Sequence, residues 1–134
     1  QAVIVKYSIE KKILENITFS RIRNSLLLDE LLGDIPEIQL VKRSPSLKEV
    51  FHLYMFKTSR RDELYKHLRN QNIDAKIHYP TPMHLQPAAK YLGYKLGDFP
   101  IAESLANQSI SLPVHEFIDE SKVVRMSECI HSFF

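Results

Sequence analysis

VFHLYMFKTSRRDELYKHLRNQNIDAKIHY, residues 50–79, is the stretch that decides the fold. Aromatic and apolar residues dominate its first part, 50–57, which is typical of a buried strand. Thr58 or Ser59 can then cap a helix through the polar segment that follows. Its last part, 73–79, is predicted to be another strand that ends at a proline-rich turn. The stretch therefore predicts a strand–helix–strand unit.

Further short elements are expected on both sides of this unit. We predict strands over 38–41 and 109–112, together with short helices around 87–92 and 100–108. The second of these helices starts at Pro100, a residue that suits a first helical turn. Strands mixed with covering helices predict the fold class α+β, with a small sheet that carries helices on one face.

The two ends of the chain both show helical periodicity. Isoleucine and leucine recur at helical spacing through residues 1–32, which predicts one long helix or two helices separated by a break. Gly33 is a suitable stop. Asp119 can cap a last helix whose apolar residues face inward. Since the chain opens with Gln1 in an apolar run, we interpret it as a piece of a longer protein.

Composition excludes several classes of function. Of the 134 residues, 44% are hydrophobic and 25% are charged, as in ordinary globular domains. The net charge is only +2 and the basic residues are scattered, so we expect no nucleic-acid partner. No apolar run is long enough for a membrane span, so we expect no membrane partner. The single cysteine, Cys129, rules out an internal disulfide and fits a reducing cytoplasm.

The strongest candidates for a functional site surround a pair of prolines. His78 and Tyr79 end the expected strand 73–79, and His84 follows after Pro80 and Pro82. Prolines stiffen a loop, and a stiff loop at a strand end can hold polar side chains in a pocket. Imidazole and phenol groups can bind sugar hydroxyls or phosphate oxygens. From spacing alone, packing is the commoner role, and two histidines without a third ligand do not predict a metal site.

Other polar residues are weaker candidates. Lys76 can meet an anionic group or face water, and His115 can approach the site from the loop after Pro113. We expect His52 to lie in the core or at the edge of the sheet, and His67 to be solvated. A solvated helix start is expected for Arg60 and Arg61, and no serine has a base at the spacing of a hydrolase triad.

Six segments, in order, resemble the C-terminal region of the sugar aminotransferase family often called DegT–StrS. The segments are HLY at 52–54, RDEL at 61–64, IHYPTPMHLQP at 77–87, LGY at 92–94, GDFPIAE at 97–103 and SISLPVH at 109–115. The resemblance extends over nearly the whole chain. It implies a small C-terminal domain of a PLP-dependent transferase of fold type I, with a mostly antiparallel sheet. Residues 1–34 would form the helix that links to a large domain, and 35–134 the small domain.

The resemblance also implies an activity. Enzymes of this family, usually homodimers, move an amino group from glutamate to a nucleotide-linked keto sugar for polysaccharide or other glycoconjugate synthesis. By the match, His78 and Tyr79 would contact the sugar nucleotide and His84 would lie close to the cofactor.

The resemblance also implies that the catalytic lysine lies outside this chain. PLP chemistry needs a lysine Schiff base and groups that hold the ring and phosphate, which in this family lie upstream of Gln1. We therefore expect that the chain alone neither binds PLP tightly nor turns over. Two alternatives stay open: a PLP-dependent sugar dehydratase with histidine in place of that lysine, and a non-catalytic regulatory relative.

Overall fold

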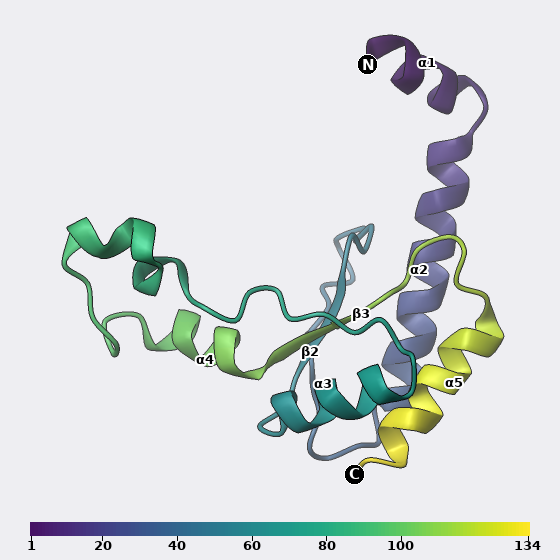
Figure 1. Cartoon of the computed structure of the whole chain (residues 1–134). Coiled ribbons are helices and arrows are strands. Elements are labelled where there is room, and N and C mark those ends of the chain that lie inside the picture. The colour runs from purple at the N-terminus through teal and green to yellow at the C-terminus, as the bar shows by residue number, and fades with distance from the viewer.

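A three-stranded antiparallel sheet forms the centre of the computed structural model, which describes all 134 residues (Figure 1). The strands are β1 (Gln39–Leu40), β2 (Tyr54–Lys57) and β3 (Ser109–Leu112), in the order β1-β2-β3. Tyr54 pairs with Leu112 and Phe56 with Ile110, so four large apolar side chains lie on one face. This confirms the expected α+β class with a small antiparallel sheet.

Three helices pack on that apolar face: α2 (Ile13–Leu32), α3 (Arg61–Asn70) and α5 (Glu120–His131). Each contributes residues at helical spacing to the core. Full burial of one such side chain contributes about 1.5–3 kcal/mol, so this shared core holds the sheet in place. The fully buried members are Leu28, Leu32, Tyr54, Phe56, Leu64, Leu68, Ala75, Ile110, Val123 and Ile130.

The expected N-terminal helix is divided into two. α1 (Ala2–Glu10) ends before Lys12, which has a left-handed conformation with φ 54°, and α2 starts at Ile13. No residue of α1 is buried, and α1 extends beyond the core at one end of α2 (Figure 1). The break agrees with the prediction of two helices, rather than one long helix, over residues 1–32. None of the helices is both long enough and apolar enough to cross a membrane.

The helix ends test the predicted capping residues. Asp119 caps α5, with Oδ1 accepting a hydrogen bond from Lys122 N at 3.0 Å, as expected. The helix α4 (Pro100–Gln108) has its predicted bounds. The cap of α3 was wrongly predicted, because Arg60 occupies that position and Thr58 Oγ1 instead accepts from Arg60 N at 3.3 Å.

Two of the predicted strands differ from the structure. Residues 73–79 form no strand, and their backbone pairs with the sheet only at Lys76, whose N and O bond to Ser111 O and N at 3.0 and 2.8 Å. The N–H groups of Ile73 and Ala75 bond to Leu68 O and Ile73 O instead, so they are lost to the sheet. Strand β2 begins at Tyr54 rather than at position 50, because Phe51 has a positive φ of 49°.

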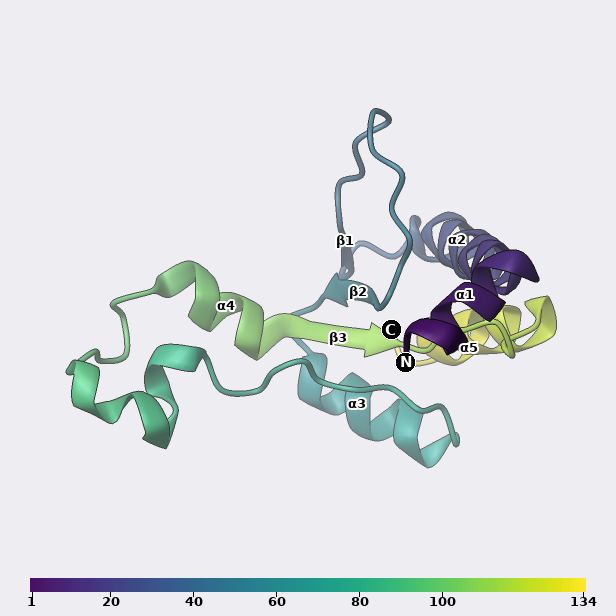
Figure 2. The ribbon, with the colours of Figure 1, turned by 90° about the horizontal axis from the view of Figure 1, so that it is seen from above.

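Residues 79–99, which we call the arm, extend away from the core (Figure 2). The arm contains two 3₁₀ helices, η1 (Met83–Leu85) and η2 (Pro87–Leu92), and it returns to the fold through α4. None of its residues is buried. Gly93 and Gly97 have φ angles of 76° and 98°, which residues with a Cβ rarely adopt, so these glycines permit the return turn.

Candidate functional site

A cleft of about 260 Å³, which we call the cleft, lies at the carboxyl end of β3. It brings together side chains from α2, from the loop before β2, from residues 74–78 and from the loop after β3. Three of the five predicted site residues, Lys76, His78 and His115, line it. The other charged or imidazole groups in its walls are Arg21, His52 and Asp74.

His78 is fixed by a hydrogen bond to the last part of β3. Its Nδ1 lies 3.1 Å from Ser111 Oγ, and Ser111 is itself only 2% exposed. The ring of Tyr79 meets the ring of His78 edge-on, with 5.6 Å between centroids, and the peptide bond between the two residues is cis. With Nδ1 bound to Ser111, Nε2 is the ring nitrogen of His78 left to meet a ligand.

Lys76 forms an ion pair at the rim of the cleft. Its Nζ lies 2.8 Å from Asp74 Oδ1, and Asp74 also accepts a hydrogen bond from Arg69. The hydrogen bond from Lys76 is the main reason why the pKa of Asp74 lies below its ordinary value. Because the Lys76 side chain is 53% exposed, this pair adds little stability, and the ammonium can turn to an anionic ligand.

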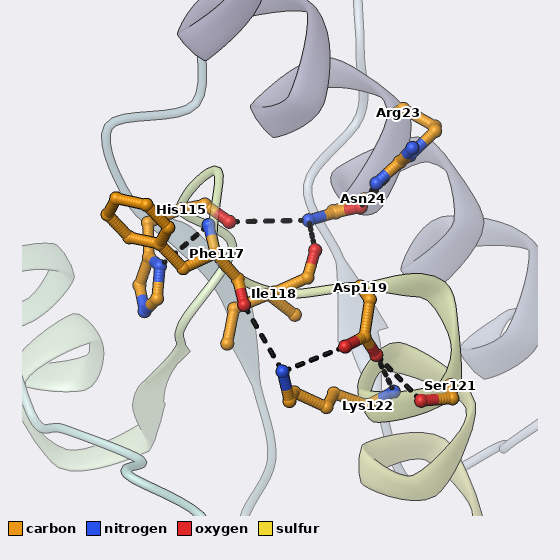
Figure 3. A network of polar contacts seen from close by, with 8 residues as sticks. All are labelled: Arg23, Asn24, His115, Phe117, Ile118, Asp119, Ser121 and Lys122. Atoms are coloured by element: carbon orange, nitrogen blue, oxygen red, sulfur yellow. Dashed lines mark hydrogen bonds and ion pairs between the residues drawn. The ribbon is translucent and has the colours of Figure 1, made fainter.

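His115 belongs to a loop that a buried asparagine holds (Figure 3). Asn24 of α2 is fully buried, and its Nδ2 donates to Ile118 O at 2.7 Å and to His115 O at 3.5 Å. Phe117 N donates to His115 Nδ1 at 3.3 Å, so Nδ1 is the unprotonated nitrogen of the neutral ring. The Nε2–H group of His115 is therefore available as a donor.

The same loop is fastened at its far end by the cap of α5 (Figure 3). Lys122 Nζ donates to Phe117 O at 3.3 Å and to Asp119 Oδ2 at 2.8 Å, and Ser121 Oγ donates to Asp119 Oδ1 at 2.6 Å. The hydrogen bond from Lys122, followed by that from Ser121, holds the pKa of Asp119 well below its ordinary value. Both ends of the loop thus have fixed positions.

Arg21 is a wall residue that sequence reasoning missed. It donates through Nη1 to Phe51 O at 3.2 Å and to His52 O at 3.1 Å, and its Nη2 lies 3.8 Å from Glu116 Oε2. Its contacts come from residues 30 or more positions away, so only the tertiary fold identifies it. The sequence offered only one of two arginines within a helical segment, with nothing to distinguish it from Arg23.

The structure separates the two predicted histidines of the proline loop. His84 and Tyr79 do not line the cleft. Tyr79 is 72% exposed at the base of the arm, whereas the His84 side chain is 8% exposed and lies 3.0 Å from Glu103 of α4. The expected single pocket is therefore divided into a cleft around His78 and a separate histidine–glutamate pair between the arm and α4. The roles of Tyr79 and His84 stay predictions.

Three weaker expectations were wrong about solvent exposure. His52 is exposed and precedes β2 instead of lying within a strand. His67 is half-buried, with Nε2 3.0 Å from Cys129 O. Arg61 is only 5% exposed, and its Nη1 donates to Ala106 O at 2.7 Å, which satisfies a carbonyl near the end of α4. The aliphatic part of a cation can be buried where its charged end meets such a carbonyl.

The cleft suits a polar or anionic ligand and does not fit PLP on its own. Its imidazole, ammonium and guanidinium groups can donate to phosphate and hydroxyl oxygens. An imine-forming lysine is activated by desolvation or a second cation, whereas Lys76, the only lysine in the walls, is exposed and paired with Asp74. No three side chains of the metal-binding types lie close enough together to hold an ion.

Comparison with known proteins identifies the family. The model of the DegT/DnrJ/EryC1/StrS aminotransferase family matches residues 1–131. The erythromycin biosynthesis sensory transduction protein EryC1 of Saccharopolyspora erythraea is 43% identical over 83 residues, which are 62% of this chain and 23% of that protein. The dTDP-3-amino-3,4,6-trideoxy-alpha-D-glucose transaminase of Streptomyces venezuelae is 35% identical over 113 residues, 83% of this chain and 30% of the relative.

A solved structure extends the match to the fold. The crystal structure of S. venezuelae DesV in complex with a ketimine intermediate superimposes with a TM-score of 0.88 and 32% identity, over 93% of this chain and 34% of that one. The chain therefore spans about a third of the length of this solved relative. Since the family model extends over nearly all of the 134 residues, the chain belongs to the DegT/DnrJ/EryC1/StrS aminotransferase family.

Proposed function

We propose that this chain is the small domain of a PLP-dependent aminotransferase that transfers an amino group from glutamate to a nucleotide-linked keto sugar. The observation that carries the proposal is the family match over residues 1–131, together with a relative named as a dTDP-amino-sugar transaminase. We use the term whole enzyme for this chain together with the two thirds of the relatives' length that it does not span.

In this proposal the cleft binds the phosphate and hydroxyl groups of the sugar nucleotide. Lys76 and the Nε2–H group of His115 are donors at its walls, and His78 Nε2 is the free nitrogen of a ring fixed by Ser111. Hydrogen bonds that involve a charged group contribute about 1.5–3 kcal/mol each. A few of them are therefore enough to favour a ligand that carries phosphate and hydroxyl groups. Tyr79 stands beside His78 and is exposed enough to reach the same ligand.

PLP is held by the remainder of the whole enzyme in this proposal. When bound there, PLP supplies the electron sink for amino transfer, whereas the residues of this chain bind and orient the sugar. We further propose that the whole enzyme is a homodimer and works in the cytoplasm, in the synthesis of a polysaccharide or another glycoconjugate. The absence of a suitable lysine in the cleft supports the assignment of PLP to the remainder.

The first test is a PLP titration of the 134-residue chain, followed by absorbance. We expect no stoichiometric Schiff base, because Lys76 stays ion-paired and exposed. Stoichiometric imine formation that Lys76→Ala abolishes would assign PLP to this domain and overturn this part of the proposal.

The second test is amino transfer by the whole enzyme. With ¹⁵N-glutamate and a panel of nucleotide-linked keto sugars, we expect the label in an amino sugar by mass spectrometry. A panel without any labelled amino sugar would contradict the proposed activity.

One relative gives weight to a regulatory alternative. EryC1, which is 43% identical to this chain over 83 residues, is named as a sensory transduction protein. A non-catalytic whole protein would lack the imine-forming lysine, so the residue at that position discriminates between the two functions. A lysine at that position, whose imine with PLP becomes covalently stable on borohydride reduction, would favour the aminotransferase function.

A further inference from the structure

His84 of the arm and Glu103 of α4 form a histidine–glutamate pair that the cleft does not use. His84 Nε2 lies 3.0 Å from Glu103 Oε1, and the two side chains are 8% and 12% exposed. Glu103 also accepts hydrogen bonds from Gly97 N at 2.9 Å and from Phe99 N at 3.3 Å. The carboxylate of Glu103 therefore links η1 and the end of the arm to the first turn of α4.

The carboxylate determines which nitrogen of His84 carries the proton. Burial alone would raise the pKa of Glu103, but hydrogen bonds from Gly97, Phe99 and His84 lower it below its ordinary value. An ionised carboxylate only accepts hydrogen bonds, so His84 Nε2 must donate. In the neutral ring, Nδ1 is then unprotonated and acts as an acceptor.

The acceptor nitrogen of His84 has no partner within the chain. The only polar contact of the His84 ring is the one between Nε2 and Glu103. The buried side-chain atoms without a hydrogen-bond partner are Ser25 Oγ and Glu116 Oε2, so Nδ1 of His84 is not sealed inside the protein. The ring of Phe99 packs against the His84 ring with 4.7 Å between centroids and restricts its rotation. The ring is therefore fixed by its contacts, while one nitrogen stays accessible.

We propose that Glu103 is a positioning residue that holds His84 in the Nε2–H tautomer, so that Nδ1 accepts a hydrogen bond from a hydroxyl or ammonium group of the ligand. This inference rests on the proposed function for the identity of the ligand. A carboxylate that orients a histidine through one nitrogen, and so frees the other, is a recurring arrangement in enzyme sites. A purely structural pair would join the arm to α4 without any requirement for the free nitrogen.

The tautomer can be read directly from the 134-residue chain by long-range ¹H–¹⁵N NMR of its histidine rings. At a pH where His84 is neutral, we expect a protonated Nε2 and an unprotonated Nδ1, without averaging between tautomers. Glu103→Gln can donate as well as accept, so it should give a mixture of tautomers, whereas the exposed control Glu128→Gln should leave the spectrum unchanged. A wild-type ring protonated at Nδ1, or a tautomer mixture, would overturn the inference without any variant.

The functional part of the test uses the whole enzyme. His84→Gln keeps a donor for Glu103 but removes the ring nitrogen Nδ1, and its amide oxygen cannot occupy the same position. We expect it to leave the amide spectrum of the arm intact and to lower kcat/KM by about tenfold, a typical loss for one hydrogen bond to a bound ligand. Unchanged kcat/KM would reduce the pair to a structural role and overturn the inference. If the wild type is inactive with every keto sugar, the proposed function fails, while the tautomer result stands by itself.

Discussion

The cleft lies at the carboxyl end of β3, whereas the arm joins the amino end of β3 through α4, and the two regions are held by different forces. Three residues at the cleft, Ser111, Leu112 and Val114, are each 2% exposed and continue into the core. The arm has no buried residue, and its Tyr91 is 84% exposed. Packing therefore fixes the cleft, whereas the arm depends on hydrogen bonds to the single carboxylate of Glu103.

This difference predicts where the protein tolerates change. A site supported by a core keeps its geometry as long as the core is filled, because interiors are densely packed. A segment held by a few polar contacts opens more easily and without global unfolding. Substitutions in the two regions should accordingly separate the stability of the whole domain from the order of the arm.

The largest expected effect is that of Phe56→Ala beneath the sheet. Phe56 is fully buried between β2 and the helices, and its truncation leaves a cavity. We expect a loss of about 3–5 kcal/mol in the free energy of unfolding, measured by urea denaturation. Tyr91→Ala in the arm is the matched control and should change it by less than about 0.5 kcal/mol. Similar losses for both variants would show that the arm shares the core.

Arg61→Met tests the link between α3 and the arm's return helix. The substitution keeps most of the buried volume but leaves Ala106 O without its donor. We expect a loss of about 1.5–3 kcal/mol, the range for a hydrogen bond to a charged group. The exposed neighbour Lys66→Met removes a charge without such a contact and should be neutral. An Arg61→Met variant as stable as the wild type would mean that the bond is not formed.

Asn24→Ala tests how the core fixes one wall of the cleft. Without Asn24, the carbonyl groups of His115 and Ile118 lose their buried donor. We expect a loss of about 1–3 kcal/mol and faster hydrogen exchange at the Ile118 amide, which bonds to His115 O. Asn107→Ala, at an exposed position of α4, is the control. Unchanged exchange at Ile118 would show that the loop holds its shape without Asn24.

The smallest effect concerns Asp119, and it depends on pH. Its pKa is lowered in the folded state, relative to an unfolded value of about 3.9. The stabilisation is therefore fully present above the unfolded pKa and is lost as pH falls through the folded pKa. We expect Asp119→Ala to lower the melting temperature at neutral pH, and this difference to shrink in acid. A difference that does not change with pH would indicate that the carboxylate charge is not involved.

Sequence reasoning predicted the parts of the molecule that local patterns determine. Helical periodicity gave α5 and its Asp119 cap, and Pro100 gave the start of α4. It failed at two kinds of position. The backbone N–H groups of Ile73 and Ala75 bond locally, so the strand expected at 73–79 does not form. Arg61 is buried because the distant carbonyl of Ala106 accepts a hydrogen bond from its guanidinium.

The same limit applies to the site. His78 and His115 were found because they end recognisable strand and loop segments, and the fold brings them to one cleft. Arg21 was missed because its partners lie 30 or more residues away. His84 and Glu103 lie 19 positions apart, so their contact could not be predicted from the sequence. The short spacing between His78 and His84 instead favoured a single pocket that contains both histidines.

The central claim is that the cleft contacts the sugar nucleotide, and the kinetics of His78→Ala in the whole enzyme test it most directly. An aminotransferase reacts with glutamate and with the keto sugar in separate half-reactions, which single-turnover experiments can follow one at a time. The account predicts that kcat/KM for the sugar nucleotide falls about tenfold or more, as expected for the loss of about 1.5–3 kcal/mol, while the glutamate half-reaction and the His131→Ala control stay unchanged. A His78→Ala enzyme that is unaffected with the sugar nucleotide, or impaired equally in both half-reactions, would contradict it.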